Sequence, residues 1–190
     1  MSPWSERYVV FDCETTGLDP AKDGILSIGA VPVEDGEIVV GDAFEAVLND
    51  WRLTPAVLVH GITPGEAARG LSEVEAVGAF LDYVGDAVLV GHHVGFDRSI
   101  VAHAAERLGR TFANPAIDTM RLALEERGVF GEQGPKGFEL DALCALFGVE
   151  PHDRHTAPGD AFLTARVFVR LRRLALRAGL EPSEFYEPVA

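Results

Sequence analysis

Cysteine and long apolar runs are both scarce in this sequence of 190 residues. Its two cysteines, Cys13 and Cys144, are too few and too far apart for a disulfide framework, so a reducing compartment is expected. No apolar run approaches the ~20 residues of a membrane span, and the first residues lack the basic and then apolar pattern of a secretory signal. These absences predict a cytoplasmic protein without membrane contact.

Positive charge is also scarce, with 16 Lys and Arg against 30 Asp and Glu and a formal net charge of −14. This balance argues against a protein that coats nucleic acid non-specifically, because phosphate binding requires Lys and Arg. The acids concentrate in residues 1–50, whereas six arginines and one acid lie between Arg154 and Arg177. These arginines form either a solvated helix face or a surface that helps to guide a strand end.

The composition, 47% hydrophobic and 24% charged, is typical of a globular protein, and we expect one domain over residues 1–190. Strand patterns at 7–12, 25–33 and 38–48 predict antiparallel hairpins, and further strands are expected at 87–90 and 115–118. Helices are expected at 54–59, 72–83, 95–108, 119–127, 140–147 and 158–178, with a glycine-rich loop at 128–137. In the last helix we expect Phe162, Ala165, Val169 and Leu176 to face inward. The order predicts an α/β fold with a mixed five-stranded sheet, three antiparallel hairpin strands followed by two parallel ones.

Two carboxylates follow the first apolar strand. Because strand side chains alternate, Asp12 and Glu14 project from one face and can share a cation, and hard oxygen ligands suit Mg²⁺ or Mn²⁺. Cys13 between them should point into the core. The alternative is that Asp12 begins a turn and Glu14 faces solvent.

Two more acids stand beside buried elements. Asp97 follows the fourth strand, and Asp160 lies five residues after His155 at the start of the last helix. Each alone is typical of an acid in the first turn of a helix. Together with Asp12 and Glu14 they can converge on two divalent ions, beside which a neutral His155 can accept a proton.

At these residues the chain resembles the DEDDh 3′–5′ exonucleases, the DnaQ-like family that includes the proofreading epsilon subunit of bacterial DNA polymerase III. The resemblance covers about Arg7 to Arg173, and three motifs carry it in order. They are Asp12-Cys13-Glu14-Thr15-Thr16-Gly17-Leu18, His92-His93 with Phe96-Asp97, and His155 with Asp160. The fold that this resemblance implies is ribonuclease-H-like, with helices on both faces of the sheet.

The resemblance also implies roles for single residues. Asp12, Glu14, Asp97 and Asp160 would be ligands of two Mg²⁺ or Mn²⁺ ions, and His155 would be the general base. Substrate contacts are expected at Thr15, Thr16, Leu18, His60, His93 and Phe96. Core packing is the alternative for Leu18 and Phe96, and a loop position for His60. The family commonly has Asn where this chain has His93, which can replace the hydrogen bonds of the amide only in part.

The implied reaction is the release of nucleoside 5′-monophosphates from the 3′ end of single-stranded or frayed DNA. An RNA-trimming exonuclease and a catalytically silent module that binds nucleic acid or a polymerase are the alternatives. Because the chain ends at Ala190, without a long tail, a stand-alone nuclease is slightly favoured over a subunit with a DNA polymerase partner.

Overall fold

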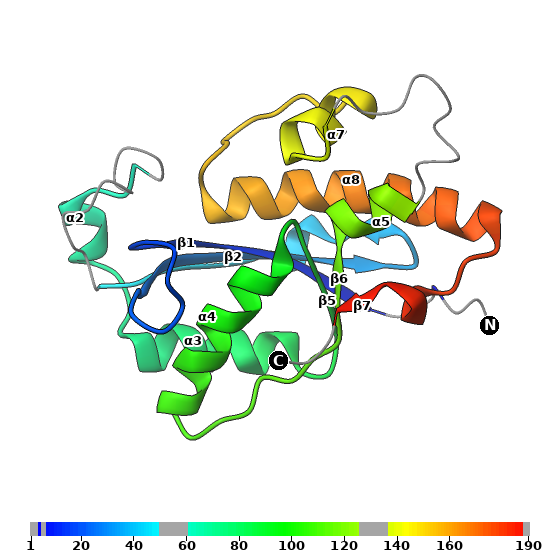
Figure 1. Cartoon of the computed structure of the whole chain (residues 1–190). Helices are drawn as coiled ribbons and strands as arrows, with labels where there is room; N and C mark the ends of the chain where they lie inside the picture. The colour runs from blue at the N-terminus through cyan, green and yellow to red at the C-terminus, as the bar shows by residue number, and fades with distance from the viewer. Residues whose placement is uncertain (1–3, 5–6, 50–60, 126–136, 188–190) are drawn as a thin grey trace.

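Seven strands of the chain form one mixed sheet in the order β3-β2-β1-β5-β6-β7, with β4 beside β2 (Figure 1). The computed structural model describes residues 4, 7–49, 61–125 and 137–187. The helix expected at 54–59, His60 and most of the expected loop at 128–137 lie outside the described residues. The described strands are β1 (Tyr8–Thr15), β2 (Ile25–Glu34), β3 (Glu37–Ile38), β4 (Phe44–Val47), β5 (Val88–Gly91), β6 (Ala116–Asp118) and β7 (Tyr186–Glu187).

The strand pairing confirms a mixed sheet, but the expected count of five strands is wrong. β1 pairs antiparallel with β2 and parallel with β5, which pairs parallel with β6. The expected third strand is divided into β3 and β4 by the 3-10 helix η1 (Val40–Asp42), where Gly41 and Asp42 are poor strand formers. β7 pairs antiparallel with β6 and was not expected, because two residues show no periodicity.

The described parts of the expected helices lie close to their expected positions, whereas α2 (Pro64–Ala67) and the 3-10 helix η3 (Pro182–Phe185) were not expected. The other helices are α3 (Glu73–Val84), α4 (Val94–Arg107), α5 (Thr119–Glu125), α7 (Leu140–Leu146) and α8 (Ala157–Ala178). The capping box of Ser72 and Glu75 opens α3 as predicted. None of the helices in the described ranges has the length and apolar character needed to span a membrane.

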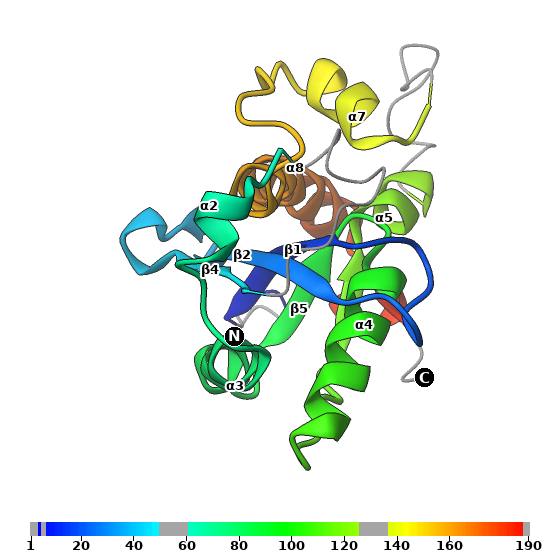
Figure 2. The same ribbon diagram turned by 90° about the vertical axis from the view of Figure 1, so that its left-hand side faces the viewer.

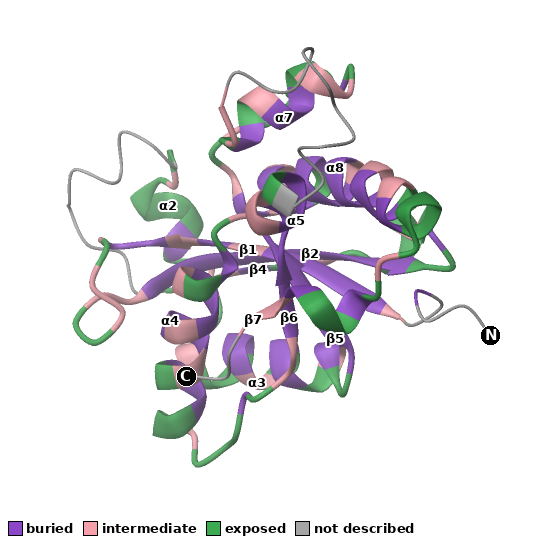
Figure 3. Cartoon of the chain, turned by 45° about the vertical axis from the view of Figure 1, so that its right-hand side comes forward, coloured by how far each residue is buried: buried purple, intermediate pink, exposed green. Residues whose placement is uncertain are grey.

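Helices cover both faces of the sheet, as the resemblance implied (Figures 2 and 3). The alternation of β1 divides its side chains between two cores. Tyr8 and Val10 pack in the core that contains Phe168 of α8. Phe11 and Cys13 pack in the core under α3 and α4, which confirms that Cys13 points away from its acidic neighbours.

The set of buried residues in α8 differs in part from expectation. Ala165 and Val169 are buried, but Phe162 and Leu176 are 37% and 38% exposed. The buried face of α8 includes Ala161, Phe168 and Ala175 and also Arg172, which donates to the Trp4 carbonyl, whereas Phe162 and Leu176 lie outside this face. Phe162 therefore belongs to the solvent side of the helix.

The first turn of α8 lies directly on β2 at Gly29. A Cβ added to Gly29 would meet the Ala157 carbonyl carbon and the Pro158 nitrogen at 2.2 Å. Gly29 is also the register partner of Asp12 on β1. The missing side chain therefore lets the start of α8 approach the strand that carries the acidic residues.

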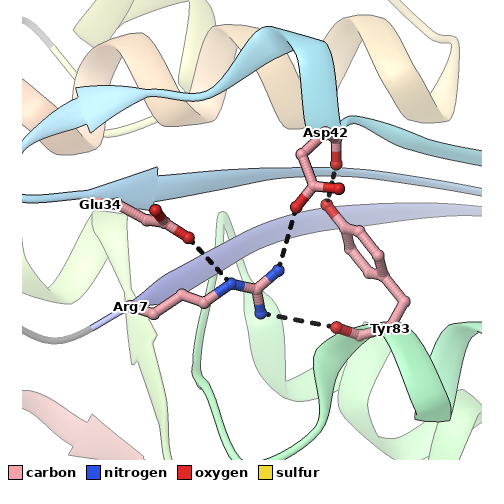
Figure 4. A network of polar contacts seen from close by, with 4 residues as sticks. All are labelled: Arg7, Glu34, Asp42 and Tyr83. Carbon is pink, nitrogen blue, oxygen red and sulfur yellow. Dashed lines mark hydrogen bonds and ion pairs between the residues drawn. The ribbon is translucent and has the colours of Figure 1, made fainter.

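A polar network fixes the other end of β1 (Figure 4). Arg7 forms ion pairs with Glu34 and Asp42 at 3.2 and 3.4 Å, and its guanidinium lies over the Tyr83 ring. The Tyr83 hydroxyl donates to the Asp42 carbonyl at 2.7 Å. Burial raises the pKa of Tyr83 to about 12, so this hydroxyl stays a donor. The network joins β1, β2, η1 and α3.

We expect Gly29→Ala to lower the free energy of unfolding by about 1–3 kcal/mol or more, because backbone atoms of α8 occupy the space that the methyl group needs. The matched control is Gly78→Ala in α3, where an added Cβ meets no atom within 4 Å. This control should instead gain about 0.5–1 kcal/mol. Urea unfolding of the three proteins measures both effects. Equal stability of Gly29→Ala and the native chain would contradict the close approach.

Candidate metal and catalytic site

Three carboxylates from two elements form a cluster where β1 meets the start of α8. Asp12 and Glu14 come from β1 and Asp160 from the first turn of α8. One oxygen of each lies within 4.8 Å of the others. Asp160 is buried and the other two are half-buried. The predicted convergence of these three acids is therefore present in the fold.

Local structure places Asp160 in this cluster. Thr156 caps α8, and its hydroxyl accepts from the Gly159 N–H at 3.2 Å. The His155 N–H donates to Asp160 Oδ2 at 3.3 Å, which holds the carboxylate against the preceding loop. The turn before the helix thus orients the acid that follows it.

Asp97 joins the cluster from the other face of the sheet. It lies in the first turn of α4 and is buried. Its Oδ1 accepts from the Cys13 N–H at 3.2 Å, between Asp12 and Glu14 in the chain. All four predicted acids are therefore brought to the carboxyl end of β1.

Burial and the charges of neighbouring acids raise the pKa values of Asp12, Glu14 and Asp97. Burial first, and then the charges of Asp97 and Asp160, hold the pKa of Asp12 well above its usual range. Burial and the charge of Asp160 raise the pKa of Glu14 to about 7. Burial also raises the pKa of Asp97 to about 8, although its hydrogen bond from Cys13 acts in the opposite direction. A bound cation would relieve this repulsion.

Arg154 supplies a positive charge beside the cluster. Its guanidinium forms an ion pair with Asp160 and a second one, at 2.7 Å, with Asp141 at the start of α7. Its positive charge acts against burial and repulsion, and so it limits how far the pKa values of Asp12 and Glu14 rise. Nothing in the sequence separates Arg154 from the arginines of α8, because only the fold brings Asp141 to it.

The donor set fits a hard divalent cation. The three clustered carboxylates offer oxygen atoms, which Mg²⁺ and Mn²⁺ prefer, and the nearby Cys13 thiol lies in the opposite core. The raised pKa values of Asp12 and Glu14 mean that protons compete with a cation for their oxygens. Asp12, Glu14 and Asp160 can therefore hold a metal ion.

The three histidines of the motifs have different surroundings. His155 is exposed and has a left-handed backbone, with φ 62°. His92 is held by a hydrogen bond between its Nδ1 and Thr119 Oγ1 at 2.9 Å, and burial lowers its pKa to about 4, so it is neutral near pH 7. His93 is the exposed, left-handed N-cap of α4 and makes no side-chain capping bond.

In the loop after β1, the hydroxyl groups of two threonines form hydrogen bonds within the protein. The Thr15 hydroxyl donates to the Gly17 carbonyl at 2.7 Å, and the Thr16 hydroxyl donates to Asp23 at 2.8 Å. Gly17 leaves room for the Asp23 carboxylate, because an added Cβ would lie 2.5 Å from one of its oxygens. Both threonines are buried, so their hydroxyls shape the loop, and a direct role in substrate binding stays a prediction.

The two apolar candidates for substrate contact remain outside the main cores. Leu18 is 88% exposed, so the alternative of core packing is wrong for it. Phe96 is half-buried, directly before Asp97, and belongs to neither core cluster of the described residues. Their roles toward a substrate stay predictions.

Asp118 is a positioning residue that the sequence reading missed. It is buried at the end of β6, and its Oδ2 accepts from the Val94 N–H at 3.0 Å, the first N–H of α4. This bond replaces the cap that His93 does not provide and fixes the helix that carries Asp97. An acid at the last position of a predicted strand was the available signal.

Known proteins share sequence and fold with this chain. A 169-residue stretch is 39% identical to a DNA polymerase III subunit epsilon-like protein of Rhodobacter capsulatus, covering 86% of this chain and 23% of that protein. E. coli exonuclease I in complex with a dT13 oligonucleotide superposes with a TM-score of 0.78 at 22% identity, covering 92% of this chain and 42% of that one. Exonuclease X in complex with 5′ overhanging duplex DNA gives 0.69 at 24% identity, covering 94% and 96%.

The fold and the three motifs are those of the DnaQ-like exonuclease family. The family model described as Exonuclease matches residues 9–168, and the chain belongs to this family. The family that the three motifs implied is thereby confirmed. The chain spans 23% of the Rhodobacter relative and 12% of the PolC-type DNA polymerase III of Bacillus subtilis that it also matches.

The raised pKa values predict how stability depends on pH in the absence of divalent cations. Because Glu14 and Asp97 are protonated up to about pH 7 and 8 in the folded chain, the folded state binds more protons than the unfolded state above pH ~4.5. The free energy of unfolding in EDTA should therefore fall as the pH rises from about 5 to about 8. Mg²⁺ should stabilise more at the higher pH.

Urea unfolding at both pH values, with EDTA or Mg²⁺, measures this effect. Asp12→Asn is the control, and it should flatten the pH dependence because it removes one of the repelling charges. A stability in EDTA that rises between the two pH values would contradict the raised pKa values.

We expect His93→Asn to raise the free energy of unfolding by about 0.5–1 kcal/mol, because Asn tolerates the left-handed backbone at φ 59° better than His does. His152→Asn is the matched control: this histidine is exposed and has no positive φ, so its replacement should change stability by less than ~0.5 kcal/mol. Urea unfolding compares the two. A destabilised His93→Asn protein would mean that the edge-on contact of His93 with His92 outweighs the backbone strain.

Proposed function

We propose that this chain is a divalent-metal-dependent 3′–5′ exonuclease that releases nucleoside 5′-monophosphates from the 3′ end of single-stranded or frayed DNA. The observation that carries the proposal is the cluster of Asp12, Glu14 and Asp160, with buried Asp97 beside it. Four acids that repel one another stabilise no fold by themselves, and strongly shifted pKa values are typical of functional sites.

The four acids would hold two Mg²⁺ or Mn²⁺ ions, which when bound neutralise the carboxylates and the charge that develops on the phosphate. Asp12 and Glu14 would orient the scissile phosphodiester at the end of β1. His155 would accept the proton of the water that attacks phosphorus, since its side chain is exposed and its backbone is bound to Asp160. The 3′-oxygen of the penultimate nucleotide leaves as the phosphorus–oxygen bond breaks.

The terminal nucleotide would lie among groups that surround this cluster. A pocket of about 240 Å³ opens beside Glu14 and is lined by Val47, Ile62 and Thr156, among others. Leu18 and Phe96 offer apolar surface on which a base can pack or stack. His93 is exposed at the start of α4, where it can donate to the substrate.

The names of the compared proteins support DNA as the substrate and a polymerase as a partner. Exonuclease I was seen with dT13 and exonuclease X with 5′ overhanging duplex DNA. The Rhodobacter relative is named as epsilon-like, so this chain would act either beside a DNA polymerase or alone. A DNA-processing role agrees with a cytoplasmic location.

The test replaces single ligands with their amides. Asp12→Asn and Asp160→Asn should each lower mononucleotide release from a single-stranded DNA by about 10³-fold or more in Mg²⁺, because a lost ligand weakens stabilisation worth several kcal/mol. Both should fold, since each amide removes a repelling charge. Asp35→Asn in the exposed β2–β3 turn is the control and should keep full activity.

A 3′-labelled oligonucleotide, read by chromatography of the released products, follows the reaction with Mg²⁺, Mn²⁺ or EDTA. Native activity in either amide variant would overturn the proposal. Binding without metal-dependent release would favour a silent binding module. Faster release from a matched RNA than from the DNA would move the substrate to RNA, and a 3′-mispaired duplex compares frayed with single-stranded ends.

A further inference from the structure

Four arginines form a row along the solvent side of α8. This arginine stripe consists of Arg166, Arg170, Arg173 and Arg177, of which the first two are half-buried and the last two exposed. Within the described residues no carboxylate forms an ion pair with any of the four. By contrast, Arg7, Arg107, Arg110, Arg121 and Arg154 all form one.

The spacing of the stripe places its members on one face. At 3.6 residues per turn, positions 166, 170, 173 and 177 fall within an arc of about 60° and span about 16 Å along the axis. An ordinary solvated helix face mixes charges of both signs, because Glu and Lys or Arg four residues apart stabilise a helix. In this chain, with its net charge of −14, no acid occurs between Asp160 and Glu181.

The stripe begins next to the acidic cluster. Asp160 is in the first turn of α8, and from there the helix runs along the sheet away from the end of β1 (Figure 1). Phe162 stands two residues after Asp160, is 37% exposed, and has the Arg166 guanidinium over its ring at 6.0 Å. An exposed aromatic ring with an arginine beside it can stack on a base.

Two adjoining pockets connect the cluster with the stripe. The pocket of about 240 Å³ beside Glu14 shares three lining residues, Glu45, Thr156 and Pro158, with a pocket of about 440 Å³. Phe162 and Arg166 line the larger pocket. The two pockets therefore lie side by side between Glu14 and the first arginine of the stripe.

We propose that the arginine stripe binds the phosphates of the substrate strand upstream of its 3′ end, which deepens the proposed function and rests on it. Acids also line the larger pocket, Glu150 and Asp153 among them, so phosphates are repelled there. The strand crosses this pocket with a base against Phe162 and its phosphates toward α8. The stripe is as long as roughly five nucleotides at the ~3.4 Å spacing of a stacked strand.

The experiment compares two variants with the same change in charge. Arg173→Gln with Arg177→Gln removes the exposed half of the stripe, far from the cluster. Arg107→Gln with Arg110→Gln is the control, because both residues are partly exposed and their ion pairs with Glu73 and Asp82 contribute little. Three substrates are used: the p-nitrophenyl ester of thymidine 5′-monophosphate, a trinucleotide and a 15-nucleotide single strand.

All proteins should hydrolyse the ester and the trinucleotide equally, because neither substrate reaches the end of the stripe. On the 15-nucleotide strand the stripe variant should lose roughly tenfold in kcat/KM at about 50 mM salt and approach the control as salt rises. The slope of log affinity against log salt should fall by about 1.4, since each phosphate contact of a single strand contributes ~0.7.

The two ways of failing are distinguishable. If the native protein hydrolyses none of the three substrates in Mg²⁺ or Mn²⁺, the proposed function fails. If the native protein is active and the stripe variant matches the control on the long strand at every salt concentration, the stripe does not bind the substrate strand. In that case the inference is overturned, and a polyanionic protein surface is the remaining ligand that could bind the four arginines.

Discussion

The contact between the first turn of α8 and β2 at Gly29 is the constraint on which the site depends. Because Gly29 is the register partner of Asp12, packing the helix against the strand also brings Asp160 to Asp12 and Glu14. On the other face, the hydrogen bond from the Cys13 N–H to Asp97 joins α4 to β1 in the same way. Docking of the two helices and assembly of the acidic cluster are therefore one event.

The electrostatic repulsion among the carboxylates of the acidic cluster opposes this arrangement. Carboxylates that would repel in water are held together in a half-buried place, so their pKa values rise instead of the fold opening. The opposing free energy comes from the two apolar cores, which lie on either side of β1 and share no member with the cluster. Arg154, fixed by Asp141, offsets part of the repulsion. A bound divalent cation would offset more of the repulsion between the carboxylates than Arg154 does.

The sequence was sufficient where local patterns determine structure. Alternation placed Asp12 and Glu14 on one face of β1, and a capping box located the start of α3. It was insufficient where a residue acts through a distant neighbour. The roles of Gly29 and Asp118 depend on backbone atoms of α8 and α4, and the exposure of Phe162 depends on how wide a face of α8 the sheet covers. These contacts join residues that lie far apart in the sequence, so no short stretch of the chain reveals them.

The net charge of −14 is compatible with a nucleic-acid substrate because of where the charges lie. Four acids gather at the end of β1, where cations rather than phosphates are their natural neighbours. Other acids pair with arginines, as Glu73 does with Arg107 and Asp82 with Arg110. The arginine stripe gathers four positive charges on a single helix face, and none of them forms an ion pair with a carboxylate of the described residues. A net charge averages over such separate surfaces, whereas a strand end held at one site meets only the charges that line its path.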